Sequence, residues 1–295
     1  MRPTESHVAR RRLLGVVFVV AVIGVGVWAA TAAVRTDGKK AEPAATTTPS
    51  PAAPPKPLRI IFPEGFTREQ MAERIRAVKE IARRKRGIEP ALSPKRYLAA
   101  TASSPLPGRF AGDGKPRSLE GFLFPASYDF FAQTTSRQLV GEQLKVFKSK
   151  WATVDLRYAR SKNLTPYDVL IIASMVEKEV VVPRERKLVA AVIYNRLHAR
   201  MPLGIDATLR YGLHIPPTKA ITKSQLESDS PYNTRKFLGL PPPPIANPGL
   251  PSIEAAAHPA RVNYLYFVRK ADCKSHYFTA SEQEFLSYPR AGLQC

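Results

Sequence analysis

The segment from residue 165 to residue 179 constrains the fold most, because its pattern predicts a helix that is apolar on every side. Thr165 can cap this helix, Pro166 suits its first position, and Asp168 follows the cap at the spacing of a capping box. The eight residues from 169 to 176 are apolar apart from one serine. Helices with apolar neighbours all round are usually buried, so we expect this one in the core.

Two carboxylates, Glu177 and Glu179, end this helix on either side of Lys178. The carboxyl end of a helix carries partial negative charge, and burial and a like-charged neighbour also disfavour an ionised acid. These three effects favour a protonated acid near neutral pH, which is typical of a general acid. The same pattern also fits a solvated helix end with salt bridges, since structural ion pairs perturb pKa values too. The local pattern leaves both interpretations open.

Residues 13–34 contain no charged side chain and predict a transmembrane helix. As a helix they would span about 33 Å, which matches a bilayer core of about 30 Å. Three arginines at 10–12 lie in the short tail 1–12, and the positive-inside rule places this tail in the cytoplasm. The chain after residue 34 is then exported from a single-pass anchor in the cell membrane. A cleaved signal peptide is the alternative, because Ala30-Thr31-Ala32 resembles a cleavage site.

Composition separates the chain that follows into a linker and a folded part. Residues 35–57 are rich in Pro, Ala and Thr and cannot bury a core, so they predict a spacer. The folded part is expected to begin with a small domain at 58 and to continue with a larger domain from about 118. Within it we predict strands at 58–62, 264–268 and 276–278, and helices at 67–84, 135–151, 166–178, 183–200 and 252–257. The turn-rich stretch 201–251 is expected to form a binding surface.

The net charge of +21 predicts an anionic partner: nucleic acid, anionic lipid or an acidic polymer of the cell envelope. Nucleic acid is disfavoured, because no nucleic-acid-binding module is recognisable and the folded part is expected outside the cell. The sequence also lacks the common zinc, nucleotide and serine-hydrolase motifs, so no metal or cofactor is expected. Cys273 and Cys295 can form a disulfide in an exported domain or remain two free thiols.

Seven separate stretches resemble, in order, one known family. They are LEGFLFP at 119–125, ASMVEKE at 173–179, YNRL at 194–197 with MPL at 201–203, DAT at 206–208 with YG at 211–212, SPYNT at 230–234 with GLPP at 239–242, NPG at 247–249 and YLYFV at 264–268. The family is that of the YceG-like endolytic murein transglycosylases. The resemblance covers about residues 58–290 and implies an α+β fold, with a small LysM-like subdomain over 58–117 and a mixed helix/strand catalytic domain over 118–295.

The resemblance implies a lytic transglycosylase, which is a lyase. Such an enzyme cleaves the β-1,4 bond between N-acetylmuramic acid and N-acetylglucosamine, closes a 1,6-anhydro ring, and so terminates the elongation of nascent glycan strands. One acid can suffice, because the C6 hydroxyl of the substrate attacks in place of water. The family's catalytic acid corresponds to Glu177, which would act first as acid and then as base. Glu179 lies about 200° around the helix and is expected to orient or support, as are Asp206 and Glu120.

The glycan strand of peptidoglycan is the partner that this resemblance implies, and peptidoglycan synthases are further candidates. Candidates for binding sugar amides and hydroxyls are Tyr194, Asn195, Tyr232, Asn233 and Asn247. Asn is also common in turns, so Asn233 and Asn247 can have purely structural roles. The alternative function is a membrane-anchored, non-catalytic protein that binds peptidoglycan or acts as a scaffold.

Overall fold

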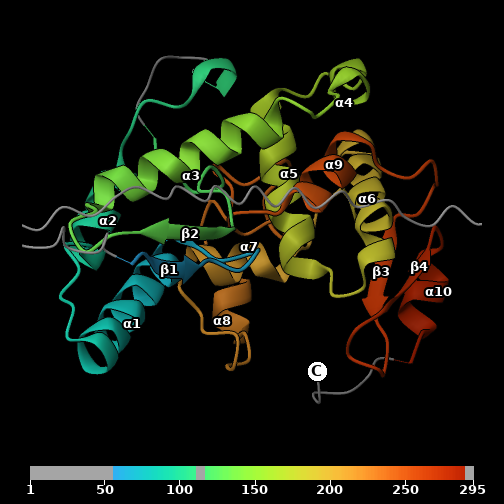
Figure 1. Ribbon diagram of the computed structural model, residues 1–295. Helices are drawn as coiled ribbons and strands as arrows, with labels where there is room; N and C mark the ends of the chain where they lie inside the picture. The colour runs from blue at the N-terminus through green and yellow to red at the C-terminus, as the bar shows by residue number, and fades with distance from the viewer. Residues whose placement is uncertain (1–55, 111–116, 290–295) are drawn as a thin grey trace, which may run out of the picture. The chain divides into compact units, whose positions relative to one another are not determined.

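The computed structural model describes residues 56–110 and 117–289 (Figure 1). The predicted tail, the predicted transmembrane helix and nearly all of the linker lie outside these residues. Within the described residues, no helix is both long and apolar enough to span a bilayer. The elements are β1 (Leu58–Ile61), α1 (Arg68–Arg86), α2 (Pro94–Ala102), η1 (Gly108–Phe110), β2 (Ser127–Phe130), α3 (Ser136–Trp151), α4 (Arg157–Ser161), α5 (Pro166–Glu179), η2 (Pro183–Glu185), α6 (Arg186–His198), α7 (Asp206–Gly212), α8 (Lys223–Leu226), α9 (Leu250–Ala257), β3 (Tyr266–Arg269), β4 (His276–Thr279) and α10 (Glu282–Ser287).

The first sheet is an antiparallel pair of β1 and β2, with Leu58 opposite Phe130 and Ile61 opposite Ser127. Side chains alternate along β1, so that Leu58 and Ile60 are buried while the residues between them face solvent. The strand predicted at 58–62 is confirmed as β1. Its partner β2 was not predicted, and it lies beyond residue 117, so this sheet joins both sides of the predicted domain boundary.

Helices α1 and α3 both begin with a capping box, formed by Thr67 with Gln70 and by Thr135 with Gln138. Both helices were predicted, at 67–84 and at 135–151. Helix α2 packs against both of them and was not predicted. Figure 1 shows α3 passing above the β1–β2 pair and α1 lying below it.

Helix α5 is the central helix of the described structure. Every residue from Val169 to Val176 is buried, which confirms the prediction from its apolar pattern. It packs against α9 and α6, and Figure 1 shows these three helices together between the β1–β2 pair and the β3–β4 hairpin. The buried Ser174 hydroxyl donates to the Ile171 carbonyl and accepts from the Ile245 amide at 3.0 Å. This serine therefore attaches the loop before α9 to the core.

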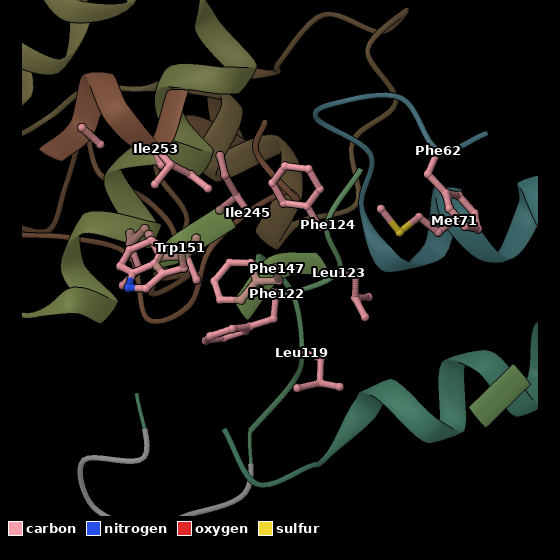
Figure 2. Packing of buried hydrophobic residues seen from close by; sticks show 14 of the residues in the cluster. Phe62, Met71, Leu119, Phe122, Leu123, Phe124, Phe147, Trp151, Ile245 and Ile253 are labelled. Atoms are coloured by element: carbon pink, nitrogen blue, oxygen red, sulfur yellow. The ribbon is translucent and has the colours of Figure 1, made fainter. Parts of the chain in front are cut away.

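An aromatic cluster fills the space between α3 and the loop before β2. Phe122 and Phe147 meet edge to face at 5.2 Å between ring centroids, and Trp151 stacks on Phe147 at 5.6 Å. Figure 2 shows these rings with Ile245 and Ile253, which approach from the α9 side. One continuous core therefore runs from the first sheet to α5 and α9.

The second sheet is the antiparallel hairpin of β3 and β4, with Tyr266 opposite Thr279 and Arg269 opposite His276. This hairpin was predicted, although β3 begins two residues later than expected. Its anchor is a buried pair in which His276 Nδ1 lies 2.8 Å from Glu185 Oε2. Glu185 ends η2, so the hairpin is fixed to the start of α6.

Candidate active site

Glu177 lies at the end of α5, beside the start of a second helix. The backbone N–H of Gly249, the N-cap of α9, donates to Glu177 Oε2 at 3.1 Å. The first N–H groups of a helix have no partner within it, so a carboxylate can accept from them. The Glu177 side chain is partly exposed, whereas the helix that carries it is buried. A ligand from solvent can therefore reach this carboxylate, while the backbone of Glu177 is held in the buried helix.

The turn between β1 and α1, at residues 63–65, lies against the Glu177 side chain. Gly65 adopts φ +75°, a conformation that favours glycine. Its N–H donates to the Asn247 carbonyl at 2.9 Å, and the Asn247 N–H donates to the Phe66 carbonyl at 3.0 Å. A Cβ at Gly65 would lie 3.4 Å from Glu177 Cγ. The turn is therefore clamped to the loop before α9 and touches the Glu177 side chain.

The same turn brings a second carboxylate, Glu64, to the site. A Cβ at Gly249 would lie 1.9 Å from Glu64 Oε1, so the Glu64 carboxylate rests directly against this glycine. Partial burial and the charge of Glu177 raise the pKa of Glu64, and Arg186 opposes them. Glu64 was not predicted, because an acidic residue in a turn carries no local signal. Only the tertiary contact with Gly249 identifies it.

Two cations accompany these carboxylates. Lys178 Nζ lies 3.4 Å from the Gly65 carbonyl, and desolvation lowers the lysine pKa while Glu177, Glu120 and Glu179 raise it. Arg186, at the start of α6, donates from Nε to the Ser252 hydroxyl at 3.2 Å. The site thus combines carboxylates and cations from two helices, α5 and α6, and one turn with the amino end of α9.

Glu179 has different neighbours from Glu177, as the predicted separation around the helix requires. Burial raises the pKa of Glu179, Arg269 lowers it, and the nearby Asp206 raises it. Asp206 begins α7 and forms a salt bridge with Arg235 at 2.6 Å. The two predicted support residues, Glu179 and Asp206, therefore belong to the contact between α5, α7 and the β3 strand rather than to the surroundings of Glu177.

Glu120 is completely buried at the centre of a hydrogen-bond network. Asn247 Nδ2 donates to its Oε1 at 2.6 Å, the Tyr211 hydroxyl to its Oε2 at 3.2 Å, and the Arg68 N–H to both oxygens at 3.2 Å. Burial raises the pKa of Glu120 to about 8, and the hydrogen bonds from Arg68 and Tyr211 oppose this. Glu120 thus cross-links three segments of the fold, and its predicted support of catalysis stays a prediction.

The amide of Asn247 has all its hydrogen bonds within the protein. Its oxygen accepts from the N–H groups of Gly121 and Leu123, each at 2.9 Å. Its nitrogen donates to the Phe66 carbonyl at 2.9 Å and to Glu120. An amide can form four such bonds, so none remains for a sugar. Asn247 therefore holds the loop that carries Gly249, which is the structural role left open by the sequence.

Asn233 also serves the protein itself, since its buried amide donates to the Leu226 and Ser228 carbonyls at 2.9 Å. Tyr232 is only partly buried, and its ring lies 5.4 Å from that of Tyr211. Tyr211 in turn donates to Glu120. Of these two predicted sugar ligands, Tyr232 is the one with a side chain that a glycan could still contact.

Tyr194 and Asn195 lie towards the other end of α6. The Tyr194 hydroxyl donates to the Ala256 carbonyl at 2.7 Å, and the Asn195 amide donates to the Val262 and Tyr264 carbonyls. Both residues line an open cavity of about 690 Å³. Tyr194 is eight residues after Arg186, about 12 Å along the helix, so this cavity is separate from the carboxylates.

Two expectations concern cysteine and metal chemistry. Cys295 lies outside the described residues, so its pairing with Cys273 stays a prediction. Among residues 56–110 and 117–289, no three His, Cys, Asp or Glu side chains converge as metal ligands.

Comparison with known proteins places this geometry in a family. The model of the YceG-like family matches residues 39–290. A Bacillus subtilis protein named endolytic murein transglycosylase is 40% identical over 155 residues, which are 52% of this chain and 42% of that protein. A Streptococcus pneumoniae protein of the same name is 31% identical over an alignment of 247 residues, which covers 76% of this chain and 43% of that protein. The chain thus matches less than half the length of these curated relatives.

A solved structure agrees with this result. The crystal structure of a yceG-like protein from Listeria monocytogenes superposes with a TM-score of 0.62 at 30% identity. The superposition covers 79% of this chain and 76% of that one. The mixed α+β architecture described above is therefore shared with a relative of known structure.

Proposed function

Because the chain belongs to the YceG-like family, we propose that it is an endolytic lytic transglycosylase that acts on the glycan strands of peptidoglycan. The observation that carries the proposal is the placement of Glu177. This carboxylate is solvent-accessible, ends a rigid buried helix, and accepts from the amino end of α9 at 3.1 Å. The names of the relatives from B. subtilis and S. pneumoniae support the same activity.

The proposed reaction breaks the β-1,4 bond between N-acetylmuramic acid and N-acetylglucosamine without water. Glu177 donates a proton to the leaving oxygen while the bond from the muramoyl C1 to that oxygen breaks. The C6 hydroxyl of the same sugar attacks C1 and closes the 1,6-anhydro ring, and the proton of this hydroxyl passes to the carboxylate that Glu177 has become. This attack is intramolecular, so the enzyme needs to hold one sugar in a suitable conformation rather than to bind and activate a water molecule.

The surroundings of Glu177 suit a long polymeric substrate. The site lies between the turn 63–65 and the start of α9, and Tyr232 offers a partly exposed ring beyond the Glu120 network. An aromatic ring can stack on a sugar face, because both present apolar surface. We propose that glycan contacts this ring and that cleavage occurs within strands, which would limit the length of nascent glycan.

The location of the protein is also a proposal. Residues 13–34 would anchor it in the cell membrane with the N-terminus in the cytoplasm, and the folded part would work in the cell envelope. The LysM-like character of residues 58–117 and the partnership with peptidoglycan synthases are proposals of the same kind. The positive charge of the chain would favour the anionic membrane surface and envelope polymers.

The test is product analysis by mass spectrometry after incubation of the folded part with purified peptidoglycan. We expect internal cleavage and new 1,6-anhydro-muramoyl ends, both of which are lost in Glu177→Gln. Reducing ends from the natural chain would contradict the non-hydrolytic mechanism. A non-catalytic wall-binding protein would instead retain the glycan in a pull-down, with or without Glu177→Gln, and would cleave no bond.

A further inference from the structure

We propose that Glu64 is a second catalytic carboxylate, which accepts the proton of the attacking C6 hydroxyl while Glu177 protonates the leaving oxygen. This assignment rests on the function proposed above and deepens it, because it divides between two residues the acid and base steps that Glu177 alone was expected to perform.

The geometric basis is that both carboxylates contact one glycine. The N–H of Gly249 donates to Glu177 Oε2 at 3.1 Å. The Gly249 α-carbon faces Glu64, since an added Cβ would lie 1.9 Å from Oε1 and 2.2 Å from Cδ of Glu64. The backbone of Gly249 has φ −74°, which any residue can adopt. The glycine is therefore required here for the room that it leaves to Glu64.

The backbone that carries Glu64 is held from both sides. Gly65 and Phe66 share two backbone hydrogen bonds with Asn247, and the Asn247 side chain donates a third to the Phe66 carbonyl at 2.9 Å. Lys178 approaches the Gly65 carbonyl at 3.4 Å from α5. Catalytic groups need this kind of support, because a displacement of about 1 Å can cost two orders of magnitude in rate.

The carboxylate of Glu64 itself is not used by the fold. Within the described part of the chain it accepts no hydrogen bond and forms no salt bridge, and the residue is exposed. A structural carboxylate such as Glu120, by contrast, has donors on both oxygens. A fixed turn that presents an unused carboxylate beside a second one is typical of a reaction centre.

The charged groups that face Glu64 come from two helices. Glu177 faces it from α5 and Arg186 faces it from α6. Lys178 of α5 lies close by, against the Gly65 carbonyl. Partial burial and the charge of Glu177 raise the pKa of Glu64, and Arg186 lowers it. A raised pKa makes the ionised Glu64 a stronger base towards the O6 proton.

The proton balance of the reaction then closes without another reactant. The protonated Glu177 gives its proton to the glycosidic oxygen as the C1–O bond breaks, and the leaving sugar departs with a free hydroxyl. The O6–C1 bond forms, and the ionised Glu64 takes the O6 proton. The pair ends with its proton on Glu64 instead of Glu177, and exchange with solvent restores the starting state.

The experiment compares Glu64→Gln with the natural chain in the peptidoglycan assay. Loss of a general base typically costs a factor of about 10² to 10⁴, so we expect the rate of anhydro-end formation to fall at least about 100-fold. We also expect the fall in rate on the acidic side of the pH profile to disappear, because no base then has to be ionised. Residue 64 with a merely structural role would leave the shape of this profile unchanged.

Two further variants make the test specific. Glu73→Gln removes an exposed carboxylate of α1 that pairs with Arg76, and it should keep the natural rate and pH profile. Gly249→Ala retains both acids but places a methyl group where the Glu64 carboxylate lies. Because that carboxylate is the end of a flexible side chain, it can move aside and the fold should survive. We expect Gly249→Ala to melt like the natural chain and to lose most of its activity.

The outcomes separate this proposal from the function on which it rests. If the natural chain cleaves no glycan, the proposed function fails, and the assignment of Glu64 fails with it. If the natural chain forms anhydro ends and Glu177→Gln does not, while Glu64→Gln keeps more than about a third of the rate, only the assignment of Glu64 is overturned. A rate loss in Glu64→Gln accompanied by a lower melting temperature and an unchanged pH profile would also overturn it.

Discussion

Glu120 and Glu177 show what different surroundings make of the same side chain. Glu120 is sealed in the interior and accepts from three segments, whereas Glu177 is partly exposed and accepts from one backbone N–H. Asn247 connects the two regions, since its side chain bonds to Glu120 and its loop carries Gly249. Glu120 therefore holds the surrounding segments in place, whereas Glu177 remains accessible to a ligand from solvent.

Glu177→Gln should reduce the activity strongly and leave the stability of the fold almost unchanged. We expect the rate of anhydro-end formation to fall by about 10² to 10⁴, because the amide cannot donate the proton that the leaving oxygen needs. The melting temperature should change little, since an amide oxygen can still accept from Gly249. Mass spectrometry of the products and a thermal melt measure the two effects. A large fall in melting temperature would mean that Glu177 also builds the fold.

Glu120→Ala should instead lower the free energy of unfolding. The change leaves the Asn247 amide, the Tyr211 hydroxyl and the Arg68 N–H without their acceptor in a buried place. Unsatisfied buried polar groups cost about 1–3 kcal/mol each, so we expect a total loss of about 3 kcal/mol or more in the free energy of unfolding. Urea denaturation measures this loss. A loss below about 1 kcal/mol would show that the network contributes little.

Glu120→Gln should make the free energy of unfolding less dependent on pH. Burial raises the pKa of Glu120 to about 8, above its usual 4.5, so the folded chain holds this proton more tightly than the unfolded chain. The stability that this provides is complete below the unfolded pKa and is lost as pH rises through the folded pKa. Between about pH 5 and pH 8 the natural chain should therefore lose on the order of a few kcal/mol relative to Glu120→Gln. A difference between the two that stays constant with pH would contradict the prediction.

Asp206→Asn should have the smallest effect. The salt bridge between Asp206 and Arg235 is half-exposed, with side-chain exposures of 48% and 46%, and such pairs contribute about 0–1 kcal/mol. The residue also lies with Glu179, away from the side chains that surround Glu177. We expect less than a twofold change in rate and less than about 1 kcal/mol in stability. A rate loss above tenfold would place α7 in the active site.

The sequence predicted best the elements whose signals are local. Capping boxes at Thr67, Thr135 and Thr165 mark the starts of three helices as they stand in the structure. Helix α2 was missed although Ser93 caps it and Pro94 begins it. The basic residues 83–86 precede it, and they were interpreted as part of a solvated face. Strand β2 was missed because its short alternation is visible only beside its partner β1.

The site was predictable only in part, for a related reason. Glu177 was identified from the apolar pattern of its helix and from a family resemblance whose stretches are each read along the sequence. Glu64 has no such signal, because its surroundings are formed by Gly249 from the far end of the chain. Asn247 was expected to bind sugar, because the sequence does not show that its side chain forms four hydrogen bonds within the fold.

The backbone clamp between Gly65 and Asn247 has a consequence for the order of assembly. The turn that carries Glu64 is synthesised early, whereas its partner loop and Gly249 follow more than 180 residues later. Such distant contacts form late in folding, because the intervening chain must first be ordered. A chain emerging from the ribosome therefore lacks this clamp until the loop before α9 has been made. The surroundings of Glu177 and Glu64 would then be completed at a late step of folding, after most of the chain has been synthesised.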